Sequence, residues 1–150
     1  MIHVFAFTAT LVAVLAYVLA TGGKPERFAM FAQLTAFGFT VAVLSFRWNA
    51  FEHLPLGLAF IDLALATVLT GLALKANRLW PITLAGMQLA TVFAHLAKAL
   101  SFPLPAAGYG IFVQLWGWPM LFVTALGAYR HRARTREIGK EADWKPLWPH

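Results

Sequence analysis

The chain has 150 residues, of which 60% are hydrophobic and only 12% are charged, about half the charged share of a soluble domain. This composition is typical of a membrane protein and argues against a soluble globular domain. The net charge is +6 and there are no cysteines, which excludes disulfides, thiolate metal sites, thiol catalysis and thioether-linked haem.

The first apolar run covers Met1–Ala20, and about 20 apolar residues are needed to cross the hydrocarbon core of a membrane. A secretory signal begins with a basic segment, and none is present here. We therefore expect an uncleaved helix over residues 3–21. The following segment, Thr21–Arg27, is rich in Gly, Pro and charge and is expected to end it.

The second helix is expected over residues 28–46. Arg47 and Trp48 come directly after it, and a Trp beside a charge at a helix end is typical of the membrane interface. Pro55 suits the first turn of the next helix, where its missing N–H costs little. We expect this third helix over residues 56–76.

The fourth helix is expected over residues 80–100, because Pro103 and Pro105 cannot continue it. A fifth helix is expected over residues 107–129. Pro119 should kink this helix, and the backbone carbonyl that it frees needs a neighbouring side chain or a water as its partner.

These elements predict an all-α integral membrane bundle of about five transmembrane helices, over residues 1–129, followed by a basic tail over residues 130–150. Five crossings place the termini on opposite sides. Ten of the 12 Lys and Arg residues fall on the side of the tail, and two, Arg47 and Lys98, on the other. Because positive residues gather on the cytoplasmic side, we expect the N-terminus outside and the C-terminus inside a bacterial inner membrane.

A polar cluster is the main candidate site within the predicted membrane region. Asp62 is a charge in an apolar helix, which costs about 2.5–3.5 kcal/mol on insertion scales. Counting from the turn near residue 77 at about 1.5 Å per residue places Asp62 and His95 at similar depths. The spacing by three, four and three residues puts four polar residues on one face of the fourth helix, and we expect this face to turn toward Asp62: Gln88, Thr91, His95 and Lys98.

Two interpretations of this cluster remain open. In the first it is an outward-opening polar pocket or proton site, because histidine changes its protonation state near physiological pH. In the second, a contact of Asp62 with His95 only joins two helices, while Lys98 extends to the outer headgroups. We predict no catalytic residue and no metal site, since the histidines and carboxylates lack a local ligand spacing. Haem is not expected, because no helix carries two histidines at haem-pair spacing.

Aromatic residues make up 15% of the chain. Trp48 and Trp80 fall at predicted membrane interfaces, which explains them. Trp116 and Trp118 lie nearer the middle of a helix. No cofactor is predicted; contact of these rings with a pigment, quinone or lipid is an alternative to ordinary helix packing.

The basic tail begins with four arginines that we expect to attract anionic lipid: Arg130, Arg132, Arg134 and Arg136. Nucleic-acid binding is not expected, because a basic tail after a membrane helix is the ordinary cytoplasmic pattern. The segment from Trp144 to Trp148 is unusually apolar for a free tail. We expect it to dock on a partner or to fold back on the membrane surface.

The segment Leu72–Pro81 reads Leu-Ala-Leu-Lys-Ala-Asn-Arg-Leu-Trp-Pro, and Ala85-Gly-Met-Gln88 and His95-Leu-Ala follow it. This pattern resembles a family of small, uncharacterised multi-pass bacterial inner-membrane proteins that carry a similar turn and a similar His-Leu-Ala segment. The resemblance covers about residues 56–129 and implies no activity. It implies that five residues form a recurrent unit: Arg78, Trp80, Pro81, Gln88 and His95.

Hydrolase and nuclease functions are not supported, because no Ser-His-Asp arrangement, phosphate loop or paired-carboxylate motif is present. Three functions remain. The first is a small accessory subunit of a larger respiratory or photosynthetic membrane complex, in contact with other subunits or with copies of itself. The second is a transporter or proton-coupled carrier that uses Asp62, His95 and Lys98. The third, and the least favoured, is a membrane enzyme that binds a cofactor or lipid.

Overall fold

The computed structural model describes residues 2–46, 56–100, 105–139 and 142–145. Six helices account for nearly all of these residues, and no strand occurs in these four ranges beyond one isolated bridge. The helices are α1 (Ile2–Thr21), α2 (Lys24–Phe46), α3 (Leu56–Lys75), α4 (Trp80–Ala99), α5 (Ala106–Leu115) and α6 (Gly117–Ile138).

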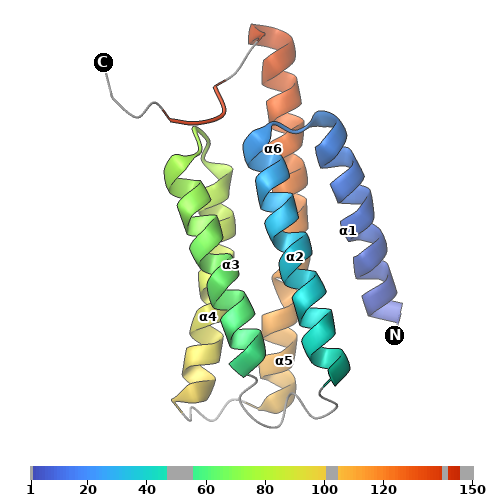
Figure 1. The fold of residues 1–150 in the computed structure, drawn as a ribbon, viewed down its shortest axis with the longest axis vertical. Helices are drawn as coiled ribbons and strands as arrows, with labels where there is room; N and C mark the ends of the chain where they lie inside the picture. The colour runs from blue at the N-terminus through green and yellow to red at the C-terminus, as the bar shows by residue number, and fades with distance from the viewer. Residues whose placement is uncertain (1, 47–55, 101–104, 140–141, 146–150) are drawn as a thin grey trace.

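The helices run alternately up and down along one common axis (Figure 1). α5 and α6 follow one another in the same direction and together form the last pass of the chain. One end of the bundle carries the tight α1–α2 turn, the α3–α4 turn and the C-terminal part of α6, and we call it the turn end. The first and last described residues lie toward opposite ends of the molecule.

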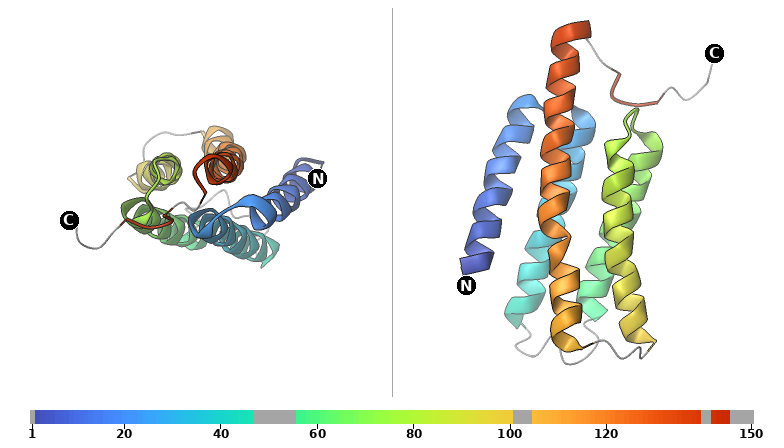
Figure 2. Two further views of the ribbon diagram at one scale, coloured as in Figure 1. Left: turned by 90° about the horizontal axis from the view of Figure 1, so that it is seen from above. Right: turned by 180° about the vertical axis from the view of Figure 1, so that it is seen from behind.

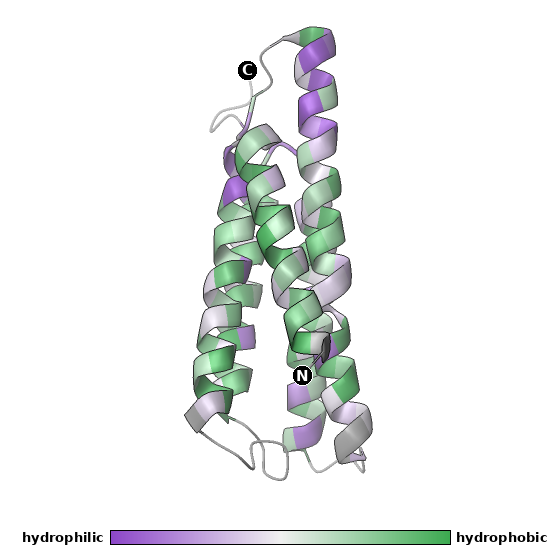
Figure 3. Ribbon diagram, turned by 90° about the vertical axis from the view of Figure 1, so that its right-hand side faces the viewer, coloured by the Kyte–Doolittle hydropathy of each residue, from purple (hydrophilic) through white to green (hydrophobic). Residues whose placement is uncertain are grey.

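Within the described residues, four stretches of helix are long and apolar enough to cross a membrane: Val4–Thr21, Lys24–Ser45, Leu56–Lys75 and Gly108–Ile138. Colouring by hydropathy shows apolar surface along the length of the bundle and hydrophilic residues gathered at the turn end of α6 (Figure 3). The structure thus confirms an all-α bundle of the membrane type. α4 has the same 20-residue length as α3, but it carries several polar residues and is not one of the four stretches.

Two groups of buried apolar side chains hold the helices together. One group lies among α2, α3, α4 and α6 and includes Leu69 and Leu84, both fully buried. The other joins α1 to α2 and α6 through Leu11, Val18 and Leu121. α1 packs against α2 and α6 and stands at the edge of the bundle when it is seen from above (Figure 2).

The predicted fifth helix, over 107–129, is divided in the structure. α5 ends at Leu115 and α6 begins at Gly117, with Trp116 between them. The expected disturbance at Pro119 therefore lies three residues earlier along the chain. Pro119 occupies the first turn of α6, where a missing N–H costs little, and the chain recovers helical hydrogen bonding when the Met120 N–H donates to the Trp116 carbonyl (3.1 Å).

α6 continues well beyond the expected helix end at residue 129 and runs to Ile138. Gly139 ends it with a positive φ of 77°, a conformation that favours glycine. The first part of the predicted tail, including all four arginines, is thus a helical extension of α6 and not a separate segment.

Candidate functional site

The α3–α4 hairpin positions the predicted polar cluster. Asp62 lies three residues before Leu65 and seven before Leu69, so it shares their face of α3, which turns into the bundle. Gln88, Thr91 and His95 are all buried on α4. The two helices are antiparallel neighbours joined by the short turn after Lys75, which brings these faces together.

Both carboxylate oxygens of Asp62 have a hydrogen-bond partner on α4. His95 Nε2 lies 2.8 Å from Oδ2, and Gln88 Nε2 donates to Oδ1 at 2.8 Å. Gln88 Nε2 also lies 3.2 Å from the Asp62 carbonyl oxygen. Gln88 therefore fixes the orientation of the carboxylate that contacts the imidazole.

Tyr109 extends this arrangement to a third helix. Its hydroxyl lies 2.6 Å from His95 Nδ1, and the two rings meet edge to face with centroids 5.7 Å apart. The result is a continuous hydrogen-bonded chain, Asp62–His95–Tyr109, that joins α3, α4 and α5. We call it the carboxylate–imidazole–phenol chain.

The carboxylate–imidazole–phenol chain can hold an extra proton while both hydrogen bonds of His95 are kept. When His95 is neutral and its Nε2–H donates to Asp62, Nδ1 accepts from the Tyr109 hydroxyl. When His95 is protonated, Nδ1–H donates and the hydroxyl oxygen accepts, because a phenol can fill either role. Rotation of one O–H bond is the only rearrangement needed.

The three members of the carboxylate–imidazole–phenol chain are buried to different extents. The His95 side chain is 4% exposed and that of Asp62 is 20% exposed, while Tyr109 is 3% exposed. The carboxylate is therefore the member of the chain that is open to its surroundings, and the imidazole and phenol lie behind it.

The other two members of the predicted cluster do not contact Asp62. The Thr91 hydroxyl turns back to its own helix and lies 3.5 Å from the Met87 carbonyl oxygen. Lys98 Nζ lies 5.8 Å from the centre of the Tyr109 ring, within the range of a cation–π interaction. The sequence reasoning did not single out Tyr109, although Tyr109 is the residue that Lys98 and His95 share.

A second polar contact lies deeper among the helices. Gln33 Nε2 on α2 donates to the Thr124 hydroxyl on α6 (2.8 Å), and both side chains are buried. The Thr124 hydroxyl donates in turn to the Met120 carbonyl (2.9 Å). This contact has no ionisable member and joins two helices.

A charged cluster closes the turn end. Arg78 contacts Glu26 through Nη1 and Asp143 through Nη2, the latter at 2.9 Å. Trp80 Nε1 and the Gly23 N–H both donate to Glu26, each at 3.1 Å. The Arg78 and Glu26 side chains are almost completely buried, so this cluster fixes α2, the α3–α4 turn and the C-terminal segment to one another.

The C-terminal segment docks on the chain itself. The Asn77 N–H donates to the Asp143 carbonyl (3.2 Å) and the Lys145 N–H donates to the Lys75 carbonyl (2.9 Å), which forms an antiparallel bridge of Trp144 with Ala76. Trp148 lies outside the described residues. Arg130, Arg132 and Arg136 are exposed on α6 and Arg134 is half-buried there.

The residues of the resemblance fall into two separate places. Arg78 and Trp80 belong to the charged cluster at the turn end, whereas Gln88 and His95 contact Asp62.

Among the described residues no group of three or more His, Asp or Glu side chains could hold a metal ion. Comparison with protein families, curated proteins and solved structures found no match to this chain. The site is therefore interpreted from its own geometry.

Proposed function

We propose that this chain is a proton-coupled carrier of the bacterial plasma membrane, in which the carboxylate–imidazole–phenol chain binds and releases the transported proton. The observation that carries this proposal is the continuous contact of Asp62, His95 and Tyr109 on three helices. An ionisable group inside a membrane bundle is costly and marks a proton or ion pathway by default. A purely structural link between two helices needs no titratable pair, as the neutral Gln33–Thr124 contact illustrates.

The proposed topology has five crossings, with the N-terminus outside and the C-terminus in the cytoplasm. The packing of α4 against α3 supports a fifth crossing, because three of the polar residues of α4, Gln88, Thr91 and His95, are buried in the bundle and not turned to lipid. Lys24, Lys75 and the arginines of α6 all lie at the turn end, and clustered positive charge is typical of the cytoplasmic side. The carboxylate–imidazole–phenol chain then lies in the outer half of the membrane.

In the proposed cycle, the loaded state carries one more proton than the resting state. His95 then has a proton on each ring nitrogen, so that Nε2–H donates to the Asp62 carboxylate and Nδ1–H donates to the Tyr109 hydroxyl oxygen. In the resting state only Nε2 is protonated, and Nδ1 accepts from the Tyr109 hydroxyl. The pair thus alternates between one and two bound protons.

Reconstitution into vesicles tests the proposal directly. The vesicles contain a pH-sensitive dye, and an ionophore sets the membrane potential. We expect the wild-type protein to admit protons and Asp62→Asn to stop this flux, because asparagine keeps the size and hydrogen-bonding capacity of the side chain but cannot be ionised. Thr91→Ala is the matched control, since Thr91 lies on the same face of α4 but its hydroxyl pairs with a carbonyl of its own helix. Wild-type vesicles without proton flux, or equal flux with Asp62→Asn, would contradict the proposal.

An accessory subunit of a larger membrane complex is the second proposal. It is favoured by the large aromatic side chains that face outward from several helices, among them Phe5, Phe93 and Phe122. The docked C-terminal segment does not add support, because its partner is this chain's own α3–α4 turn. Purification from the source membrane in mild detergent separates the two proposals. A large co-migrating complex supports the subunit, and a lone small particle contradicts it.

A further inference from the structure

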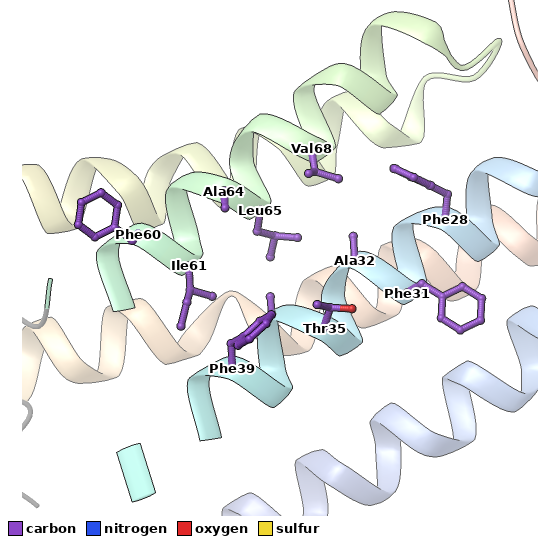
Figure 4. A pocket seen from close by; sticks show the side chains of 11 residues that line it. Phe28, Phe31, Ala32, Thr35, Phe39, Phe60, Ile61, Ala64, Leu65 and Val68 are labelled. Atoms are coloured by element: carbon purple, nitrogen blue, oxygen red, sulfur yellow. The ribbon is translucent and has the colours of Figure 1, made fainter. Parts of the chain in front are cut away.

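An apolar groove lies between α2 and α3 on the outside of the bundle. Its volume is about 560 Å³, within the range of roughly 300–1,000 Å³ that small-molecule sites occupy. Ile61, Leu65 and Val68 extend from α3 toward Phe28, Ala32 and Phe39 of α2 (Figure 4). The lining holds one polar side chain, Thr35, among ten apolar ones.

The groove is about one membrane leaflet deep. It extends along α2 from Phe28 to Phe39, which is about 17 Å at about 1.5 Å per residue. The hydrocarbon core is about 30 Å thick, so the groove covers roughly half of it, beginning at the turn end. A second helix crossing the membrane would need a partner surface along the whole height of the bundle, whereas a single acyl chain of one leaflet needs about this depth.

Two lysines stand at the turn end of the groove. Lys24 precedes Phe28 by four residues, and Lys75 follows Val68 by seven, so each shares the helix face of a groove residue. Both side chains are exposed, and neither forms an ion pair within the part of the chain that the structure describes.

The two acidic residues of the charged cluster do not neutralise the two lysines. Glu26 is fully buried and Asp143 is largely buried, and both carboxylates are paired with Arg78. The mouth of the groove is therefore positive and its body is apolar. That is the complement of a lipid that carries a negative headgroup on a hydrocarbon chain.

We propose that this groove binds one anionic phospholipid, whose acyl chain lies between α2 and α3 and whose phosphate is held by Lys24 and Lys75. A second copy of this chain is a poorer occupant. A two-fold contact through this face would bring two further lysines against the first two, since the same patch meets itself. The groove is formed by α2 and α3, whereas the carboxylate–imidazole–phenol chain joins α3, α4 and α5, so the proposal goes beyond proton transport and does not depend on it.

Native mass spectrometry of the purified full chain in detergent tests the proposal, with phosphatidylglycerol and phosphatidylcholine of identical acyl chains as probes. We expect one phosphatidylglycerol to stay bound under conditions that remove phosphatidylcholine. The double variant Lys24→Gln/Lys75→Gln should weaken phosphatidylglycerol binding about tenfold, because each cation near the headgroups contributes to the attraction. Ala64→Trp, at an exposed position in the lining, should fill the groove and reduce the binding of both lipids.

Arg132→Gln/Arg136→Gln is the matched control. It removes two exposed positive charges at the same end, on α6 and away from the groove, and should leave phosphatidylglycerol binding unchanged. Equal retention of both lipids, or equal losses from the arginine and lysine variants, would overturn the proposal. So would a stable dimer in detergent that Ala64→Trp dissociates, because a second copy would then occupy the groove. Retained helicity by circular dichroism verifies that each variant is folded.

Discussion

Tyr109 and Asp62 together provide one hydrogen-bond partner for each ring nitrogen of His95. With the phenol hydroxyl at Nδ1 and the Asp62 carboxylate at Nε2, each ring nitrogen has one partner of its own. A carboxylate can only accept, so the proton of the neutral ring belongs on Nε2. Nδ1 of the neutral ring then needs a donor, and the Tyr109 hydroxyl supplies it.

Replacing Tyr109 by Phe tests this role. The substitution removes the hydroxyl that pairs with Nδ1 and leaves a buried nitrogen without its partner, which costs about 1–3 kcal/mol. We expect a lower thermal stability in detergent and slower proton flux in vesicles. A substitution that leaves both quantities unchanged would show that the phenol contact has no part in the site.

Arg78 is the buried cation on which the turn end depends. Removing one member of a buried ion pair leaves its partner uncompensated, at a cost of about 3–5 kcal/mol. We expect Arg78→Ala to lower the free energy of unfolding by about this amount. The double variant Glu26→Gln/Arg78→Met should cost less, because it leaves no buried charge at position 26. Chemical denaturation in detergent measures both, and a double variant that is less stable than Arg78→Ala would refute the argument.

Gly127 permits the close approach of α6 to Trp80. A Cβ atom at this position would lie 2.9 Å from Cε2 of the indole ring, and the ring cannot withdraw without losing its bond to Glu26. We expect Gly127→Ala to destabilise the protein by about 1–3 kcal/mol. Gly86→Ala is the control, because nothing lies within 4 Å of a Cβ there. It should be neutral, or stabilising by up to about 1 kcal/mol through helix propensity; thermal unfolding compares the two variants.

At the scale of the element, the α3–α4 hairpin was the part of the fold that the sequence described best. Two apolar runs and a short turn with Pro81 were sufficient to expect antiparallel neighbours, and counting from the turn placed Asp62 and His95 at one depth. Helix rotation, which depends on packing against the other helices, decides whether such residues touch. For the same reason Thr91 and Lys98 were grouped with Asp62, although neither contacts it.

Other elements escaped prediction for identifiable reasons. Tyr109 contacts His95 from α5, and no spacing in the sequence links these two residues. The sequence around Pro119 indicated a disturbance of the last pass but not its position. Glu26 and Arg78 are 52 residues apart, and no periodicity links residues at such a distance. The extension of α6 to Ile138 was missed because a run of arginines indicates where the membrane segment ends. It does not indicate whether the helix also ends there.

Hydrogen exchange can test whether the ion pair of Asp143 with Arg78 holds the C-terminal segment in place. Asp143→Asn removes the charge that Arg78 Nη2 binds, while the side chain keeps its size. We expect the backbone N–H of Lys145, which donates to Lys75, to exchange with solvent faster in this variant. Hydrogen–deuterium exchange detected by mass spectrometry of the C-terminal peptide measures the change. An unchanged rate would mean that the backbone bridge holds the segment without the ion pair.

At the scale of the whole molecule, the proposed orientation is open to direct test because the chain has no cysteines. Leu100 and Ile138 are exposed at opposite ends of the bundle, so a single cysteine at each position reports one side of the membrane. We expect a membrane-impermeant maleimide to label Leu100→Cys in intact cells, and to label Ile138→Cys only after the membrane is permeabilised. The wild-type chain is the unlabelled control. The reverse pattern would place the turn end outside.

The charged cluster at the turn end also has an order in time. The ribosome delivers Glu26 first, Arg78 52 residues later and Asp143 65 residues after that. During synthesis Glu26 therefore has no Arg78 to pair with until α3 has been made. Arg78 in turn can pair with Asp143 only after α6 is complete. Closure of this end thus follows the insertion of every helix, and a nascent chain that has lost one helix to the wrong side leaves the cluster incomplete.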